Sequence, residues 1–102
     1  ILEVKKMKET ISIVELKNLL KQQNIKLIDI RPNYQYNRGT IPTAINIPYQ
    51  TLMLFKEKYL LKEEEYYLFC DSGKYSYEAV RKLRPLGYQV FSIEEGYDGF
   101  LK

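Results

Sequence analysis

Short apolar runs alternate with longer amphipathic stretches along this chain of 102 residues. Runs of strand length stand at residues 26–30, 66–69 and 89–93, and segments with helical spacing of their apolar residues lie between them. Such alternation is typical of α/β proteins, in which helices connect parallel strands. The sequence therefore predicts an α/β fold.

Local signals place further elements. Ser12 and Glu15 form a capping box, which predicts a helix over about 13–23. Thr51 is expected to cap a helix that runs to about Tyr59. We expect residues 34–48 to form mostly loop, because glycine and proline punctuate them. The remaining expectations are strands near 8–11 and 44–47, a helix over 76–83, and a short helix or turn near 96–99.

Length and composition bound the remaining choices. The chain predicts one domain over residues 1–102, with 1–8 as an N-terminal extension. Acids and bases are interspersed and sum to a net charge of +3, which does not favour nucleic acid as a partner. The apolar runs are far shorter than the roughly 20 residues that span a bilayer. We expect no membrane partner and a cytoplasmic protein, although secretion stays open because the sequence begins at Ile1.

Cys70 is the single cysteine, and the chain has no histidine. It follows an apolar strand and precedes a helical segment, so a helix N-terminus and successive backbone N–H groups would converge on its sulfur. Such surroundings stabilise a thiolate and favour a nucleophile. The alternative is a buried cysteine that acts as a small hydrophobe. A chain without histidine excludes Cys–His catalysis and a metal site built on Cys and His ligands.

The loop after Cys70 has the composition of a turn. Its residues Asp71, Ser72 and Gly73 are expected to hold the sulfur at a rim and not in a core. Asp71 would disfavour a thiolate unless it points outward, to solvent or to a cation such as Lys74. Ser76 has two candidate roles, which are the N-cap of the following helix and an additional donor to the sulfur.

The region from Asp29 to Pro48 resembles the signature of the rhodanese family, D-x-R-x-x-x-E-Y-x-x-G-H-I-P-G-A-x-N-I-P. The agreeing residues are Asp29, Arg31, Tyr36, Gly39, Ile41, Pro42, Ala44, Asn46, Ile47 and Pro48. Gln35 replaces the Glu, and Thr40 replaces the His. Cys70 stands about where that family has its nucleophile. The resemblance implies a three-layer α/β/α domain with a central, mainly parallel sheet of about five strands.

The resemblance also implies a function. Rhodanese-like domains are sulfurtransferases that hold a sulfane sulfur as a persulfide on the active cysteine, here Cys70, and need no cofactor or metal. The expected partners are a small sulfane-sulfur donor, such as thiosulfate, and a thiol acceptor, either a small thiol or a thioredoxin-like protein. The expected substrate-binding residues are Asp71, Ser72, Gly73, Lys74, Tyr75 and Ser76. Asp29 and Arg31 are expected to be structural residues near the site, with a substrate-binding pair as the alternative.

Tyr75 departs from the family loop, in which an arginine usually stands. A tyrosine offers one hydroxyl and no charge to an anionic donor, and Lys74 would have to compensate as a mobile charge. These departures leave a second interpretation open, a rhodanese-homology module that binds a partner without chemistry. A cysteine phosphatase or arsenate reductase is a third, but its C-x5-R loop needs an arginine where this chain has Ser76.

Overall fold

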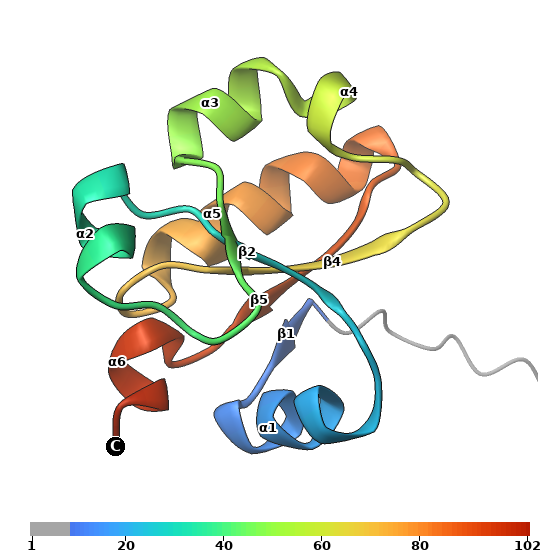
Figure 1. The fold of residues 1–102 in the computed structure, drawn as a ribbon. Coiled ribbons are helices and arrows are strands. Elements are labelled where there is room, and N and C mark those ends of the chain that lie inside the picture. The colour runs from blue at the N-terminus through green and yellow to red at the C-terminus, as the bar shows by residue number, and fades with distance from the viewer. Residues whose placement is uncertain (1–8) are drawn as a thin grey trace, which may run out of the picture.

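The computed structural model describes residues 9–102 of the chain. Five parallel strands form one sheet in the order β1–β5–β4–β2–β3, and helices lie on both faces (Figure 1). The elements are β1 (Thr10–Ile11), α1 (Ile13–Gln22), β2 (Lys26–Asp29), α2 (Asn33–Arg38), β3 (Ile45–Asn46), α3 (Tyr49–Leu54), α4 (Lys56–Tyr59), β4 (Glu65–Phe69), α5 (Lys74–Leu83), the 3-10 helix η1 (Arg84–Leu86), β5 (Gln89–Ile93) and α6 (Gly96–Phe100). The predicted α/β class and the parallel sheet are confirmed.

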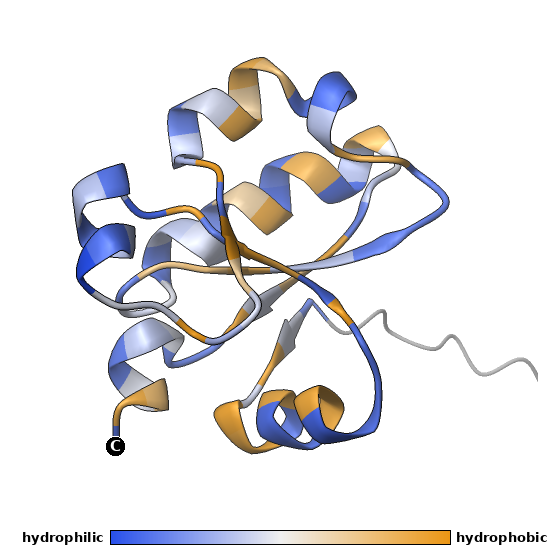
Figure 2. Cartoon of the chain, viewed as in Figure 1, coloured by the Kyte–Doolittle hydropathy of each residue, from blue (hydrophilic) through white to orange (hydrophobic). Residues whose placement is uncertain are grey.

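Two apolar layers fill the space between the sheet and its helices. Successive side chains of a strand point to opposite faces, so Leu68 and Phe69 at the end of β4 belong to different layers. The first layer includes Leu52 of α3 and Leu83 of α5, and the second includes Leu16 of α1. Hydrophobic and hydrophilic residues alternate along α1 and α5, as expected of helices that cover a sheet with one side (Figure 2).

Residues 33–38 form helix α2, where the sequence predicted loop. None of the six side chains of α2 is buried, so the helix has no apolar stripe that a periodicity could reveal. Pro32 stands at its N-cap with φ −56°, a value that proline adopts without cost before a helix. The loop prediction was therefore wrong for α2.

The predicted helix after Thr51 is also different in detail. It begins at Tyr49, directly after Pro48, and Thr51 lies inside its first turns and does not cap it. The helix is interrupted at Phe55, whose φ of −119° separates α3 from α4. Pro48, whose ring presets φ, precedes the helix at the N-cap position that the sequence analysis assigned to the Thr51 hydroxyl.

β4 is the central strand, and α5 begins at Lys74, two residues earlier than predicted. The predicted N-terminal strand is present as β1, although residue 8 lies outside the described residues. Within residues 9–102 no helix has the length and apolar character needed to cross a membrane.

Candidate active site

Cys70 directly follows β4, and residues 71–73 turn the chain into α5. The backbone N–H of Gly73 donates to the sulfur Sγ at 3.3 Å, and the N–H of Ser76 donates to it at 3.4 Å. Both N–H groups belong to the start of α5, where the helix itself supplies no acceptor and its dipole is positive. The start of the helix thus directs two donors at one sulfur atom.

Gly73 gives the loop its curvature. Its φ is +98°, in the left-handed region, and a Cβ there would lie 2.2 Å from the carbonyl oxygen of Glu94, just after β5. A side chain would therefore move the loop away from the sheet and move the N–H of Gly73 away from the sulfur. Glycine, the one residue type without a Cβ, therefore suits this position.

Helix α6 holds the other side of the loop. The N–H groups of Tyr97 and Asp98 donate to the carbonyl oxygens of Cys70 and Asp71 at 2.8 and 2.9 Å. A Cβ on Gly96 would lie 2.5 Å from both of those oxygens, so glycine permits this close approach. The C-terminal segment therefore fixes the backbone on either side of the sulfur.

Ser76 lies in the first turn of α5, whose N-cap is Gly73, so the predicted capping role was wrong. The Ser76 hydroxyl lies 3.2 Å from the carbonyl oxygen of Gly73, to which it donates, and 2.6 Å from Oγ of Ser92 in β5. The Ser76 oxygen accepts from Sγ of Cys70 at 3.7 Å. The group of Ser76 that donates to the sulfur is therefore its backbone N–H and not its hydroxyl.

Cys70 is only 4% exposed and packs in the apolar layer beneath α5, so the expectation of a sulfur at a rim was wrong. It nevertheless lines a pocket of about 620 Å³ at the carboxyl ends of β2 and β4. Ligands of open parallel sheets bind at this edge. The cysteine therefore lines a pocket, packs in the apolar layer beneath α5 and accepts from two backbone amides.

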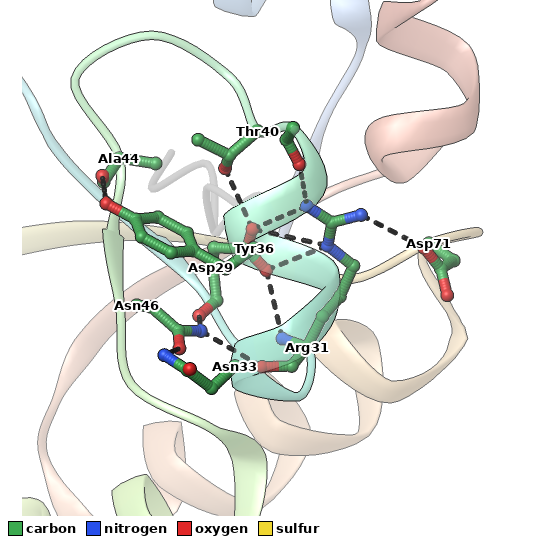
Figure 3. A network of polar contacts seen from close by, with 9 residues as sticks. Asp29, Arg31, Asn33, Tyr36, Thr40, Ala44, Asn46 and Asp71 are labelled. Atoms are coloured by element: carbon green, nitrogen blue, oxygen red, sulfur yellow. Dashed lines mark hydrogen bonds and ion pairs between the residues drawn. The ribbon is translucent and has the colours of Figure 1, made fainter.

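Beside the pocket, Asp29 and Arg31 form an ion pair whose side chains are 0% and 5% exposed (Figure 3). Nη2 of Arg31 donates to Asp29 Oδ2 at 2.7 Å and to the carbonyl oxygen of Gly39 at 2.6 Å. Burial alone would lower the pKa of Arg31, but the hydrogen bond and charge of Asp29, together with Asp71, outweigh it and raise that pKa. The guanidinium therefore stays charged and fully engaged within the protein.

Three further side chains complete this network. The Thr40 hydroxyl donates to Oδ2 of Asp29 at 2.8 Å. The amide of Asn46 donates to the carbonyl oxygens of Asp29 and Arg31 at 2.8 and 3.0 Å. The ring of Tyr97 lies against the guanidinium, with its centre 4.3 Å from the Arg31 carbon Cζ. The buried pair thus has the additional partners that a buried charge requires.

The remaining loop residues take different positions. The carboxylate of Asp71 is 49% exposed and accepts from Nη1 of Arg31 at 3.4 Å, so the cation beside it is Arg31, where the sequence offered solvent or a cation such as Lys74. Asp71, Ser72 and Tyr75 line the pocket, whereas Gly73, Lys74 and Ser76 are absent from its described lining. Lys74 therefore adds no charge to the pocket wall.

Residues 12–102 match the family model of the rhodanese-like domain. The chain belongs to the rhodanese-like family. Sulfurtransferases are among its relatives, as the names of two similar proteins show. It is 34% identical over 92 residues to human thiosulfate:glutathione sulfurtransferase, covering 78% of this chain and 80% of that protein.

Solved structures agree with this assignment. The fold matches a human single-domain sulfurtransferase with a TM-score of 0.78 and 28% identity, covering 93% of this chain and 96% of that one. It also matches the protein SSP1007 of Staphylococcus saprophyticus with a TM-score of 0.84 and 30% identity, covering 90% and 92% of the two chains. The three-layer arrangement is thus that of rhodanese-like domains.

The structure shows what the departures from the rhodanese-like signature do. Thr40, in place of His, holds the buried Asp29. Gln35, in place of Glu, lines the pocket, and its Oε1 is buried without a hydrogen-bond partner among the described residues. Tyr75, in place of the loop arginine, is 56% exposed, and its ring centre lies 6.3 Å from that of Tyr49.

Sequence reasoning missed two residues of this rhodanese-like site. Ser92 is buried in β5 beside Ser76, and the one signal for it was a hydroxyl in the middle of an apolar strand. Tyr49 lines the pocket directly after Pro48, the last position of the signature. Its partner in the ring contact, Tyr75, is distant in sequence, so no local pattern predicts the pair.

Proposed function

We propose that this rhodanese-like domain is a sulfurtransferase that carries a sulfane sulfur as a persulfide on Cys70. The observation that supports it most is the pair of N–H groups, from Gly73 and Ser76, that donate to Sγ of a cysteine that lines a pocket. Donors fixed around a sulfur stabilise negative charge on the thiolate and on a persulfide without reorganisation. The similarity to proteins named sulfurtransferases agrees with this function.

The transfer takes two displacement steps. The Cys70 thiolate attacks the outer sulfur of a donor, the donor's bond to that sulfur breaks, and the leaving group departs with the electron pair. An acceptor thiolate then attacks the outer sulfur of the Cys70 persulfide, and Cys70 leaves as a thiolate that the same two amides stabilise. Neither step needs a histidine or another general base.

The other predicted residues have supporting roles in this proposal. Asp71, Ser72 and Tyr75 form the pocket wall, and the start of α5, from Gly73 through Lys74 to Ser76, directs the amide donors. Asp29 and Arg31 position the loops beside the pocket and do not bind substrate, because their polar groups already have partners. A single free thiol that must stay reduced fits a cytoplasmic protein.

Intact-mass measurement tests this function. The protein is incubated with thiosulfate, with 3-mercaptopyruvate, or with a cysteine desulfurase that carries a persulfide. We expect the mass of one sulfur atom to be added by at least one donor, to be lost on addition of a thiol acceptor, and to be absent from Cys70→Ser. If no donor adds sulfur at Cys70, the sulfurtransferase function is wrong and the module that only binds a partner is favoured.

A further inference from the structure

We infer that the pocket over Cys70 takes a hydropersulfide whose carbon substituent is apolar and uncharged, and that it disfavours small inorganic dianions such as thiosulfate. This inference rests on the proposed sulfur transfer and specifies its donor. Three observations on the pocket carry it: the balance of charge, the character of the wall, and the space available.

The charges next to the pocket sum to a negative value. Among its described lining residues Arg31 is the one cation and Asp71 the one anion. The Arg31 guanidinium already contacts two carboxylates, those of Asp29 and Asp71, so this cluster has a net charge of −1. Arg31 is also only 5% exposed, whereas the side chain of Asp71 is 49% exposed. Among the residues that line this pocket, an entering dianion therefore meets an exposed carboxylate and no unpaired cation.

The rest of the wall is uncharged and largely apolar. Ile30, Pro32 and Pro48 line one part of it, and Tyr49 and Tyr75 line another. The two tyrosine rings are tilted by 60° with centres 6.3 Å apart, so they present ring faces and edges to a group that enters. Aromatic and aliphatic surface of this kind binds a carbon substituent by excluding water.

The available space also fits an organic donor better than an inorganic anion. A volume of about 620 Å³ is within the usual range for pockets that bind organic ligands. A second hollow of about 360 Å³ lies along α3 and shares Tyr49 and Gln50 with the first. Lys82 also lines it, and this cation is paired with Glu78 at 3.1 Å. The substituent that the wall favours can therefore belong to a small molecule or to the side chains that flank a cysteine persulfide in a polypeptide.

The donor step balances without a further reactant. The Cys70 thiolate attacks the outer sulfur of R–S–S–H, the S–S bond breaks, and R–S⁻ leaves with the electron pair, while the proton stays on the new Cys70 persulfide. With thiosulfate the leaving group is sulfite, a dianion that would have to depart past Asp71. The pocket thus opposes the entry of thiosulfate and the build-up of negative charge on the sulfite that leaves.

A matched set of donors tests the inference in the full chain. We would compare kcat/KM for thiosulfate, benzyl hydropersulfide, its para-carboxylate analogue, and the persulfide of a blocked Ala-Cys-Leu peptide. We expect benzyl hydropersulfide to exceed its carboxylate analogue at least about fivefold, because the two donors differ only in the charge that meets Asp71. The faster of the benzyl and peptide donors identifies the source of the substituent.

Two variants separate charge from contact. Asp71→Asn is expected to raise the ratio of thiosulfate to benzyl hydropersulfide efficiency about tenfold, because it removes the charge that repels the dianion. Tyr75→Ala is expected to lower the same benzyl efficiency about threefold to tenfold, through loss of ring contact. Tyr77→Ala is the matched control, since Tyr77 is also an exposed tyrosine of α5 but lies outside the pocket lining. Thermal unfolding checks that each variant is folded.

The outcomes distinguish this inference from the proposed function. If every donor fails to load Cys70, sulfur transfer itself is wrong. If thiosulfate loads Cys70 as efficiently as benzyl hydropersulfide, or if Asp71→Asn leaves the ratio of the two unchanged, the donor inference is wrong while sulfur transfer stands.

Discussion

A cysteine as buried as Cys70 is usually inert, because apolar surroundings disfavour its thiolate. Here the sulfur also has two backbone donors. The N–H groups of Gly73 and Ser76 donate to Sγ, and Cys70 lines the pocket. Under the proposed function, the site depends on backbone donors and not on an ionisable neighbour, in a chain that has no histidine.

The backbone of Thr43 is strained. It has φ +77°, in the left-handed region, which costs an L-residue about 1–2 kcal/mol. The rhodanese signature has glycine at this position. Since Thr43 is exposed, we predict that Thr43→Gly raises the free energy of unfolding by about 1 kcal/mol, measured by urea denaturation.

Thr43→Ala is the control for this change, because it removes the branched side chain but keeps the Cβ. We expect Thr43→Ala to recover less stability than Thr43→Gly. Equal stability of the two variants would show that the conformation of Thr43 carries no strain.

At the scale of the elements, the loop between β4 and α5 depends on the absence of a Cβ at residue 73. Gly73 and Gly87 make a matched pair, with φ of +98° and +100°. A Cβ on Gly73 would collide with the Glu94 carbonyl oxygen at 2.2 Å, whereas one on Gly87 would meet only the Lys62 side chain, at 3.5 Å.

We therefore predict different results for the two alanine variants. Gly87→Ala bears only the cost of a positive φ in a residue with a Cβ, so it should lose about 1 kcal/mol of stability. Its sulfur loading at Cys70 should stay normal. Gly73→Ala should lose more stability and should load sulfur at least about tenfold more slowly, because it displaces one amide from the sulfur. Urea denaturation and the rate of mass gain measure the two effects. Equal loading by both variants would contradict the role of the Gly73 amide.

The sequence predicted the elements with strong local signals and missed those without them. The capping box of α1 is present, with Ser12 and Glu15 each accepting the other's backbone N–H. The strands β2, β4 and β5 lie where the short apolar runs stand. Helix α2 was missed because it buries no side chain, and Ser76 was assigned to the wrong position of α5 because the left-handed turn at Gly73 has no apolar pattern.

In the candidate site too, the features with local sequence signals could be predicted and the others could not. Cys70 and its loop could be located from the sequence, because they follow a strand and carry turn residues. The depth of Cys70, the bond between Asp71 and Arg31, and the ring contact of Tyr49 with Tyr75 could not. Each of these joins segments that are distant in sequence and meet only once the sheet has formed.

At the scale of the whole molecule, Arg31 connects the segments around the carboxyl edge of the sheet. It contacts Asp29 at the end of β2, Gly39 after α2, Asp71 after β4, and Tyr97 of α6. A buried ion pair adds little net stability relative to an apolar pair, but removing one partner leaves an uncompensated charge. The stability of this edge therefore depends on both members being present.

We predict that Arg31→Met lowers the free energy of unfolding by about 3–5 kcal/mol. The double variant with Asp29→Leu should recover part of that loss, because no buried charge is left. Lys26→Met is the control, since it breaks an exposed ion pair with Glu64 at 3.1 Å and should cost less than about 1 kcal/mol. Urea denaturation of the three variants measures the difference. A cost for Arg31→Met as small as that for Lys26→Met would contradict this role.

The hold of α6 on the loop has a consequence for protein synthesis. The N–H groups of Tyr97 and Asp98 donate to the carbonyl oxygens of Cys70 and Asp71, and the Glu94 carbonyl lies directly against Gly73. The loop around the sulfur is therefore held by residues that are synthesised after it. A partly translated chain would lack these contacts to the loop that carries Cys70. Under the proposed function, Cys70 would then take up sulfur only once this edge of the sheet has formed.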